Sequence, residues 1–149
     1  MSDTPDPERV RRRLSRAATE YERVEADLAE AGGESAVRGT AGAYHTFRRL
    51  LANNQEAATG SGFQEYIEFQ EKVADHTDSL DESLPAYDAF EAADDAVHKK
   101  RLSADDFETA RRALDPAREY ADLLVEWEAT EELLREARRE ARDRLDRLD

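Results

Sequence analysis

The stretch that decides the fold is residues 7–33, PERVRRRLSRAATEYERVEADLAEAGG. Apolar side chains recur in it at alternating spacings of four and three residues, which is the period of one face of an α-helix. Every position of that series is apolar: Val10, Leu14, Ala17, Tyr21, Val24, Leu28 and Ala31. A series of this kind over three heptads is typical of a helix that packs along another helix in a coiled coil.

Local signals mark both ends of this first helix. Asp6-Pro7 places an N-cap residue before a proline, whose missing N–H is not needed in the first turn. Gly32-Gly33 ends the helix, because glycine adopts the left-handed C-cap conformation without strain. We therefore expect a helix over residues 7–31.

The rest of the chain also has helical periodicity. Start signals precede further helical segments at Ser35, at Ser61 with Gln64, at Ser103 with Asp106 and at Asp115-Pro116. Pro85 is expected to end the third helix. A shorter helix follows and is expected to end in His98-Lys99-Lys100-Arg101, because cations are stabilising at a helix C-terminus. No alternation of period two and no Asn-Gly or Asp-Gly hairpin turn occurs, so strands are not expected.

The longest helix is expected over residues 116–149, at the other end of the chain. Its heptad path is less regular than the first, because it also crosses Glu131 and Arg138. The apolar positions on that path are Tyr120, Leu124, Trp127, Leu134, Ala141, Leu145 and Leu148.

These segments predict an all-α fold, a helical bundle of about five to six helices in a single domain over residues 1–149. Helices 7–31 and 116–149 are expected to pair as an antiparallel coiled-coil-like stalk, with residues 35–115 inserted between them as a helical bundle. Bulky aromatic side chains are expected to fill the core of that bundle: Tyr44, Phe47, Phe63, Tyr66, Phe69, Tyr87 and Phe90.

The charge balance indicates the environment. The chain has 36 Asp and Glu against 22 Lys and Arg, a formal charge of -14, and lysine occurs only at 72, 99 and 100. Residues 63–95 alone hold eleven acids and one base. Such a composition is typical of a cytosol at molar salt, where the Debye length falls to about 3 Å and acidic side chains repel one another little. We expect a halophilic, archaeal source and a cytoplasmic protein, since no targeting segment or membrane-spanning run is present.

Catalytic motifs are missing. The chain has no Cys, which excludes a disulfide scaffold, a Cys-ligated metal site and a thiol enzyme. Asp95-x-x-His98 only approximates the paired Glu-x-x-His units of a dimetal helical bundle, so a metal-carboxylate enzyme is the least favoured alternative. We predict no catalytic, cofactor-binding or metal-binding residues and read the acidic face as a solvated surface: Glu65, Glu68, Glu71, Asp75, Asp78 and Glu82.

The favoured interpretation is a non-enzymatic helical scaffold or protein-interaction module of a halophilic cytosol. Its heptad helices would bind a protein partner or a second copy of the chain, and no membrane is expected as a partner. The candidate interaction residues are Val10, Leu14, Tyr21, Val24, Leu28, Trp127, Leu145 and Leu148.

An alternative is a nucleic-acid-associated accessory protein. Arginine side chains can grip phosphates, but the net charge opposes nucleic acid, and Arg9, Arg13 and Arg16 flank the apolar series, where they can pair with acids of another helix. This alternative is therefore not favoured. Its candidate phosphate contacts are Arg9, Arg11, Arg12, Arg13, Arg16, Lys99, Lys100 and Arg101.

The order of these segments resembles an uncharacterised haloarchaeal family of helical, coiled-coil-rich proteins. The resemblance implies an all-helical fold and a lineage, and it carries over no site residues. The stretches that carry it are Ala31-Gly32-Gly33, Ala58-Thr59-Gly60-Ser61-Gly62-Phe63, Tyr66-Ile67-Glu68-Phe69-Gln70, Leu84-Pro85-Ala86, Lys100-Arg101-Leu102-Ser103 and Asp106-Phe107.

Overall fold

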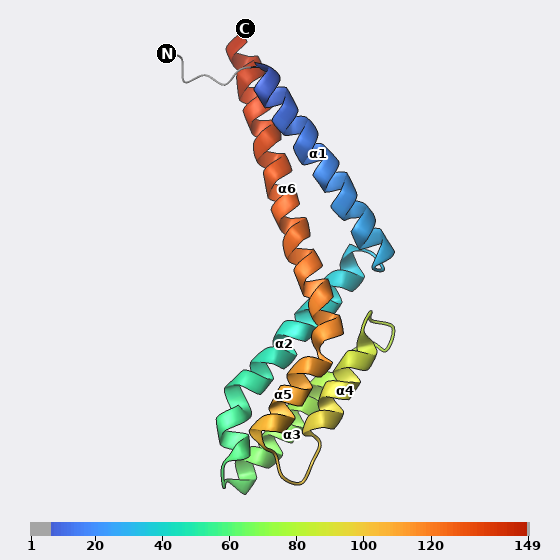
Figure 1. Ribbon diagram of the computed structural model, residues 1–149, viewed down its shortest axis with the longest axis vertical. Helices are drawn as coiled ribbons and strands as arrows, with labels where there is room; N and C mark the ends of the chain where they lie inside the picture. The colour runs from blue at the N-terminus through green and yellow to red at the C-terminus, as the bar shows by residue number, and fades with distance from the viewer. Residues whose placement is uncertain (1–6, 149) are drawn as a thin grey trace. The chain divides into compact units, whose positions relative to one another are not determined.

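A computed structural model describes the backbone of residues 7–148 and the side chains of residues 7–144. Over these residues the chain forms six α-helices and no strand, which confirms the predicted all-α fold (Figure 1). The helices are α1 (Pro7–Glu30), α2 (Glu34–Thr59), α3 (Phe63–Asp78), α4 (Tyr87–Val97), α5 (Ala104–Ala113) and α6 (Asp115–Leu148).

The chain divides into two compact units. The hairpin unit comprises Met1–Glu30 and Leu123–Asp149, and its described part is α1 with the later part of α6. The bundle unit comprises Ala31–Asp122, which contains α2 to α5 and the first turns of α6. The expectation of a single domain over residues 1–149 stays a prediction.

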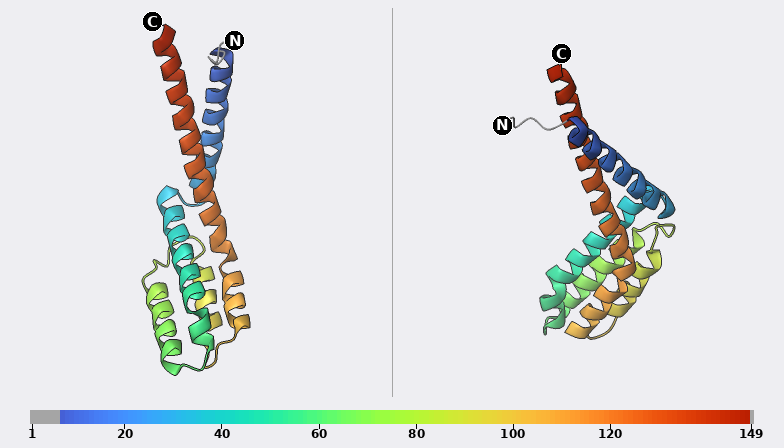
Figure 2. Two further views of the ribbon diagram at one scale, coloured as in Figure 1. Left: turned by 90° about the vertical axis from the view of Figure 1, so that its left-hand side faces the viewer. Right: turned by 45° about the horizontal axis from the view of Figure 1, so that its top comes forward.

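The hairpin unit pairs the first and last helices, as the sequence predicts. Ion pairs join Arg13 to Glu140 and Arg23 to Glu126, so residue numbers fall along α6 as they rise along α1. The two helices therefore run antiparallel (Figures 1 and 2). In the described part of this unit, no third element covers the apolar faces of the two helices.

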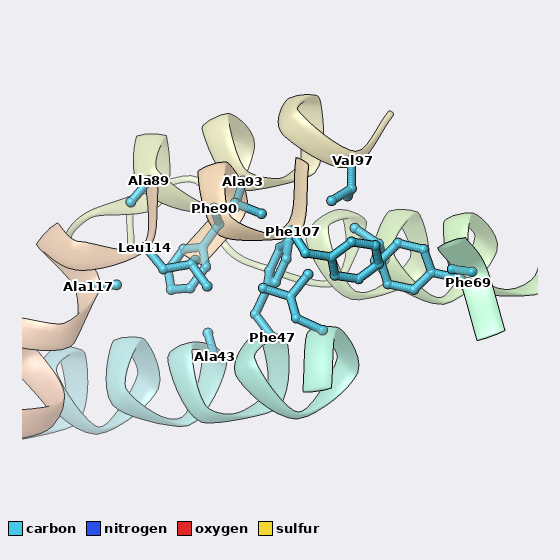
Figure 3. Packing of buried hydrophobic residues seen from close by; sticks show 14 of the residues in the cluster. Ala43, Phe47, Phe69, Ala89, Phe90, Ala93, Val97, Phe107, Leu114 and Ala117 are labelled. Carbon is cyan, nitrogen blue, oxygen red and sulfur yellow. The ribbon is translucent and has the colours of Figure 1, made fainter. Parts of the chain in front are cut away.

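The bundle unit is an up-and-down four-helix arrangement. Contacts join α2 to α3, α3 to α4, α4 to α5 and α5 back to α2, so the ring of helices closes. Fully buried phenylalanines from all four helices meet in the core (Figure 3). The ring centroids of Phe69 and Phe107 lie 5.1 Å apart, and those of Phe47 and Phe90 lie 6.5 Å apart.

Phe63 is not part of this core, contrary to the prediction. It is the first residue of α3 and is 74% exposed. Phe107 of α5 is buried in this core, and a capping box begins that helix. Ser103 and Asp106 exchange hydrogen bonds there, as predicted: the Ser103 N–H donates to the Asp106 carboxylate at 2.9 Å.

Two other predicted start signals are wrong. Neither Ser35 nor Ser61 caps a helix, because α2 begins directly after Gly33 and α3 directly after Gly62, without a side-chain cap. The N-cap residues are Gly33, two residues before Ser35, and Gly62, one residue after Ser61.

Two predicted helix ends also differ. Helix α3 ends at Asp78 instead of continuing to Leu84, and Ser79 Oγ donates a hydrogen bond to the His76 carbonyl at 2.6 Å. The Asp81 carboxylate accepts from the backbone and the hydroxyl of Ser83, and these bonds lower the pKa of Asp81. Short polar side chains that bond the nearby backbone in this way compete with helix formation. Helix α4 ends at Val97, so residues 98–101 lie in the following loop.

No helix among residues 7–148 is both long enough and apolar enough to cross a membrane.

The joint between α1 and α2 depends on glycine, and this is testable. Gly33 has a φ of 100° and a ψ of 163°, a region that is essentially restricted to glycine. We expect Gly33→Ala to lower the free energy of unfolding by about 1–3 kcal/mol in urea titrations at fixed salt. The control is Gly42→Ala, inside α2, where an added Cβ meets nothing within 4 Å. That variant should gain up to about 1 kcal/mol. Equal changes in the free energy of unfolding for the two variants would contradict the requirement for glycine at position 33.

His76 provides a pH-dependent term in the bundle unit. Its half-buried ring packs edge-on against Phe47, and its Nε2 lies 3.2 Å from the Ala43 carbonyl. Burial lowers the pKa of His76, so the folded state keeps the ring neutral. The unfolded chain binds more protons, so stability falls as the pH drops below about 6.5. In His76→Gln, which can keep the hydrogen bond to Ala43, unfolding titrations should show less of this loss; identical pH profiles would contradict it.

Candidate interaction surfaces of the hairpin unit

The predicted apolar series of α1 forms the inner face of the hairpin unit. Val10, Val24 and Leu28 are buried, and Leu14 and Tyr21 are half-buried. A second chain that reached these side chains would have to displace α6 of the same molecule. Their predicted role in binding another chain stays a prediction, and Leu145 and Leu148 lie outside the residues whose side chains are described.

The inner face of α6 differs from the predicted heptad path. Thr130 and Ala137 are buried, whereas Glu131 is half-buried and Arg138 is exposed. The heptad path predicts that the fourth residue after Trp127, Glu131, faces α1, but in the structure the third residue, Thr130, is the buried one. The buried positions of α6 are therefore taken by the small side chains Thr130 and Ala137, and the charged side chains of Glu131 and Arg138 keep contact with solvent. The Thr130 hydroxyl donates to the Trp127 carbonyl at 2.8 Å, so its burial leaves no unsatisfied donor.

Two aromatic side chains, Tyr21 of α1 and Trp127 of α6, pack against each other on this face. Their ring centroids lie 4.7 Å apart at an interplanar angle of 38°, and Trp127 is 4% exposed. Tilted aromatic pairs at this distance are favourable beyond the area that they bury. Trp127 therefore packs inside the hairpin unit.

Ion pairs fix the register of the two helices on their outer sides. Arg13 Nη1 lies 2.9 Å from Glu140. Arg23 contacts Glu126 of α6 as well as Glu20 and Asp27 of its own helix. The hydrogen bonds that Arg23 donates to Glu20 and Glu126 raise the pKa of Arg23, and the bond to Glu20 lowers the pKa of that carboxyl group. All of these groups keep contact with solvent, so the pairs specify alignment more than stability.

Charge is separated along the hairpin unit. We define its basic half as residues 8–16 and 135–144, which hold ten arginines and four acids, a net charge of +6. Its acidic half is residues 17–30 and 123–134, which hold nine acids and one arginine, a net charge of -8. The α1 arginines form a predicted cluster, whereas those of α6 were not predicted, because acidic residues stand between them in the sequence.

The basic segment at 99–101 lies in the bundle unit, apart from the α1 arginines in sequence and unit. Lys99 Nζ lies 2.8 Å from Asp106, and the Lys99 carbonyl accepts hydrogen bonds from Tyr66 and Gln70. The hydrogen bond from Lys99 lowers the pKa of Asp106. Lys99 thus ties the loop to α5, while Lys100 and Arg101 are exposed. Because α4 ends at Val97, these cations follow the helix instead of forming its last turn, and their interaction with its C-terminus stays a prediction.

The acidic face of α3 is exposed over the predicted positions, and His98 is exposed too. Among the described residues, no three His, Asp or Glu side chains gather in an arrangement that could hold a metal ion. His76, one of three histidines, packs against Phe47 in the bundle core.

Exposed apolar side chains of α6 were missed by the sequence analysis. Val125 is 64% exposed and Leu133 is 56% exposed. Together with exposed Ala129 they recur every four residues and form what we call the apolar stripe. Beside it lies a groove in which Ala17, Leu133 and Ala137 alternate with polar and charged side chains: Arg13, Ser15, Arg16, Thr19, Glu20, Glu136 and Glu140. These residues could have been found from the sequence, because they are apolar but do not occupy the heptad positions that face α1.

Comparison with known families gives one match. The sequence profile of a family described as Domain of unknown function (DUF7118) matches residues 14–149. No curated protein matches the chain. No solved structure matches it.

Proposed function

The chain belongs to the DUF7118 family of unknown function, and from the surface of its hairpin unit we propose that it is a non-enzymatic interaction module that pairs with a second copy of itself. The observation that carries this proposal is the apolar stripe. Its large side chains, Val125 and Leu133, face solvent although the apolar faces of α1 and α6 are otherwise covered.

A second copy suits the stripe because a two-fold contact places the same surface on both sides. Val125, Ala129 and Leu133 lie along one helix, so two antiparallel copies of α6 can bring their stripes together. The two hairpins would then form a four-helix bundle, the usual way in which paired helices complete a core.

The expected affinity is modest. Complete burial of a Val or Leu side chain contributes about 1.5–3 kcal/mol, so covering the exposed parts of two Val and two Leu gains on the order of 5 kcal/mol. Part of that gain is offset by the entropy lost on association. The pairing therefore depends on protein concentration, as expected of a module that assembles reversibly.

Salt should favour this pairing. Glu128, Glu132 and Glu136 are exposed near the stripe, and a two-fold contact brings the acids of both copies together. At molar salt the Debye length is about 3 Å, so this repulsion is largely screened. The same reasoning underlies our proposal that the protein works in a halophilic cytosol, for which the acidic composition is the support.

The pairing can be tested by measuring mass with light scattering over a range of protein concentrations. In molar KCl the mass should rise towards that of a dimer, and Leu133→Glu should hold it at that of a monomer. Phe63→Glu is the matched control, because it places the same charge on an exposed large apolar side chain of the bundle unit. A wild-type mass that stays monomeric at all concentrations, or equal loss in both variants, would refute the proposal.

The halophilic assignment predicts that low salt unfolds the protein. Exposed acids crowd α3 and α4, and their repulsion grows as screening is removed. Far-ultraviolet circular dichroism should show helix loss on dilution from molar to tenth-molar KCl. Replacing Glu68 and Glu71 together by lysine should lower the salt that is needed, whereas replacing both by aspartate should not. A melting temperature indifferent to KCl would contradict the assignment.

A further inference from the structure

We propose that the basic half of the hairpin unit binds the phosphate groups of a nucleic acid without regard to base sequence. This goes beyond the proposed self-association and uses other residues. The arginine-lined hollows of the basic half include neither Val125 nor Leu133. The two proposals can therefore fail separately.

Arginines from both helices contribute to this surface. On α1, Arg9, Arg12, Arg13 and Arg16 share one side of the helix, because they follow at spacings of three, one and three residues, and they line one hollow. On α6, another hollow is lined by Tyr21, Glu131 and Leu134 together with a second arginine group: Arg135, Arg138, Arg139 and Arg142. The Arg13–Glu140 pair holds the two groups at the same level of the hairpin unit.

Most of these guanidinium groups are available. Of the arginines on this surface whose side chains are described, Arg13 pairs with Glu140 and Arg135 with Glu132. Exposed side chains without such a pair are Arg9, Arg11, Arg12, Arg16, Arg138, Arg139 and Arg142. Guanidinium groups that are not neutralised by carboxylates are the usual partners of phosphate oxygens.

The net negative charge of the whole chain does not prevent phosphate binding, because the acidic and basic residues of the hairpin unit lie in different halves. The acidic half repels phosphates, so it restricts a polyanion to the basic half instead of preventing contact. Each arginine group spans seven residue steps, about 10 Å along its helix. Duplex DNA carries one charge per about 1.7 Å of axis, so several phosphates fit beside such a length.

Nucleic acid fits better than an anionic membrane surface. A helix that lies on a membrane presents large apolar side chains beside its basic ones. The exposed large apolar residues of the described chain are Phe63, Ile67, Val125 and Leu133. Leu133 shares a groove with Arg13 and Arg16, but none of the four lines the two arginine-lined hollows. Phosphate contacts alone also carry no sequence information, so we expect similar affinity for different sequences of one length.

The test uses the full chain and fluorescence anisotropy of a labelled DNA duplex. Titrations are made at several KCl concentrations, each confirmed by circular dichroism to keep the chain folded, with an uncharged osmolyte added at the lowest ones. Two triple variants remove charge from the site. One combines Arg9→Gln, Arg12→Gln and Arg16→Gln, and the other combines Arg138→Gln, Arg139→Gln and Arg142→Gln.

The matched control combines Arg48→Gln, Arg49→Gln and Arg112→Gln. These arginines are exposed on the bundle unit, so the control changes the net charge equally without touching the basic half. Wild-type binding should weaken steeply with salt. Each site variant should weaken binding at least tenfold and reduce the slope of log affinity against log salt by about 3, one for each lost phosphate contact. The control should change both little.

Three outcomes would overturn the proposal. The first is no binding of the duplex at the lowest salt at which the chain is folded. The second is an equal loss of DNA affinity in the control variant, which would show that the affinity depends on the net charge of the chain and not on the basic half. The third is binding to vesicles that contain anionic lipid with no binding to DNA, which would assign the surface to a membrane. A Leu133→Glu chain that still binds DNA would keep this result independent of self-association.

Discussion

The pairing of α1 with the later part of α6 is the interaction on which the hairpin unit depends. These helices come from opposite ends of the sequence, and among the described residues of their unit each covers the apolar face of the other. Because that coverage is one-sided, it leaves both an apolar stripe and a large charged surface in solvent. In the bundle unit, by contrast, four of the five phenylalanines are fully buried.

The two proposed activities follow from how charge and apolar surface are distributed on this unit. The apolar stripe favours a second copy, and the basic half favours phosphates, on separate residues of α6. Salt acts on them in opposite directions: it screens the acids around the stripe and weakens phosphate contacts. Ionic strength would therefore set the balance between self-association and polyanion binding.

The amount that could be predicted from the sequence varies with the range of the interaction. The series from Val10 to Leu28 and the Ser103–Asp106 capping box were readable because each depends on residues close in the chain. The choice between Thr130 and Glu131 on α6 was not, because it depends on where α1 lies. The ends of α3 and α4 were overestimated, since local hydrogen bonds at Ser79 and Asp81 compete with helical ones.

The contact between Tyr21 and Trp127 allows the pairing of α1 and α6 to be followed by tryptophan fluorescence. Trp127 is the single tryptophan of the chain, and it belongs to the hairpin unit, whereas the buried phenylalanines belong to the bundle unit. The intrinsic emission of the indole therefore registers whether α1 and α6 are closed on each other. Total helicity registers both units, so a transition seen in one signal before the other would separate opening of the hairpin from melting of the bundle.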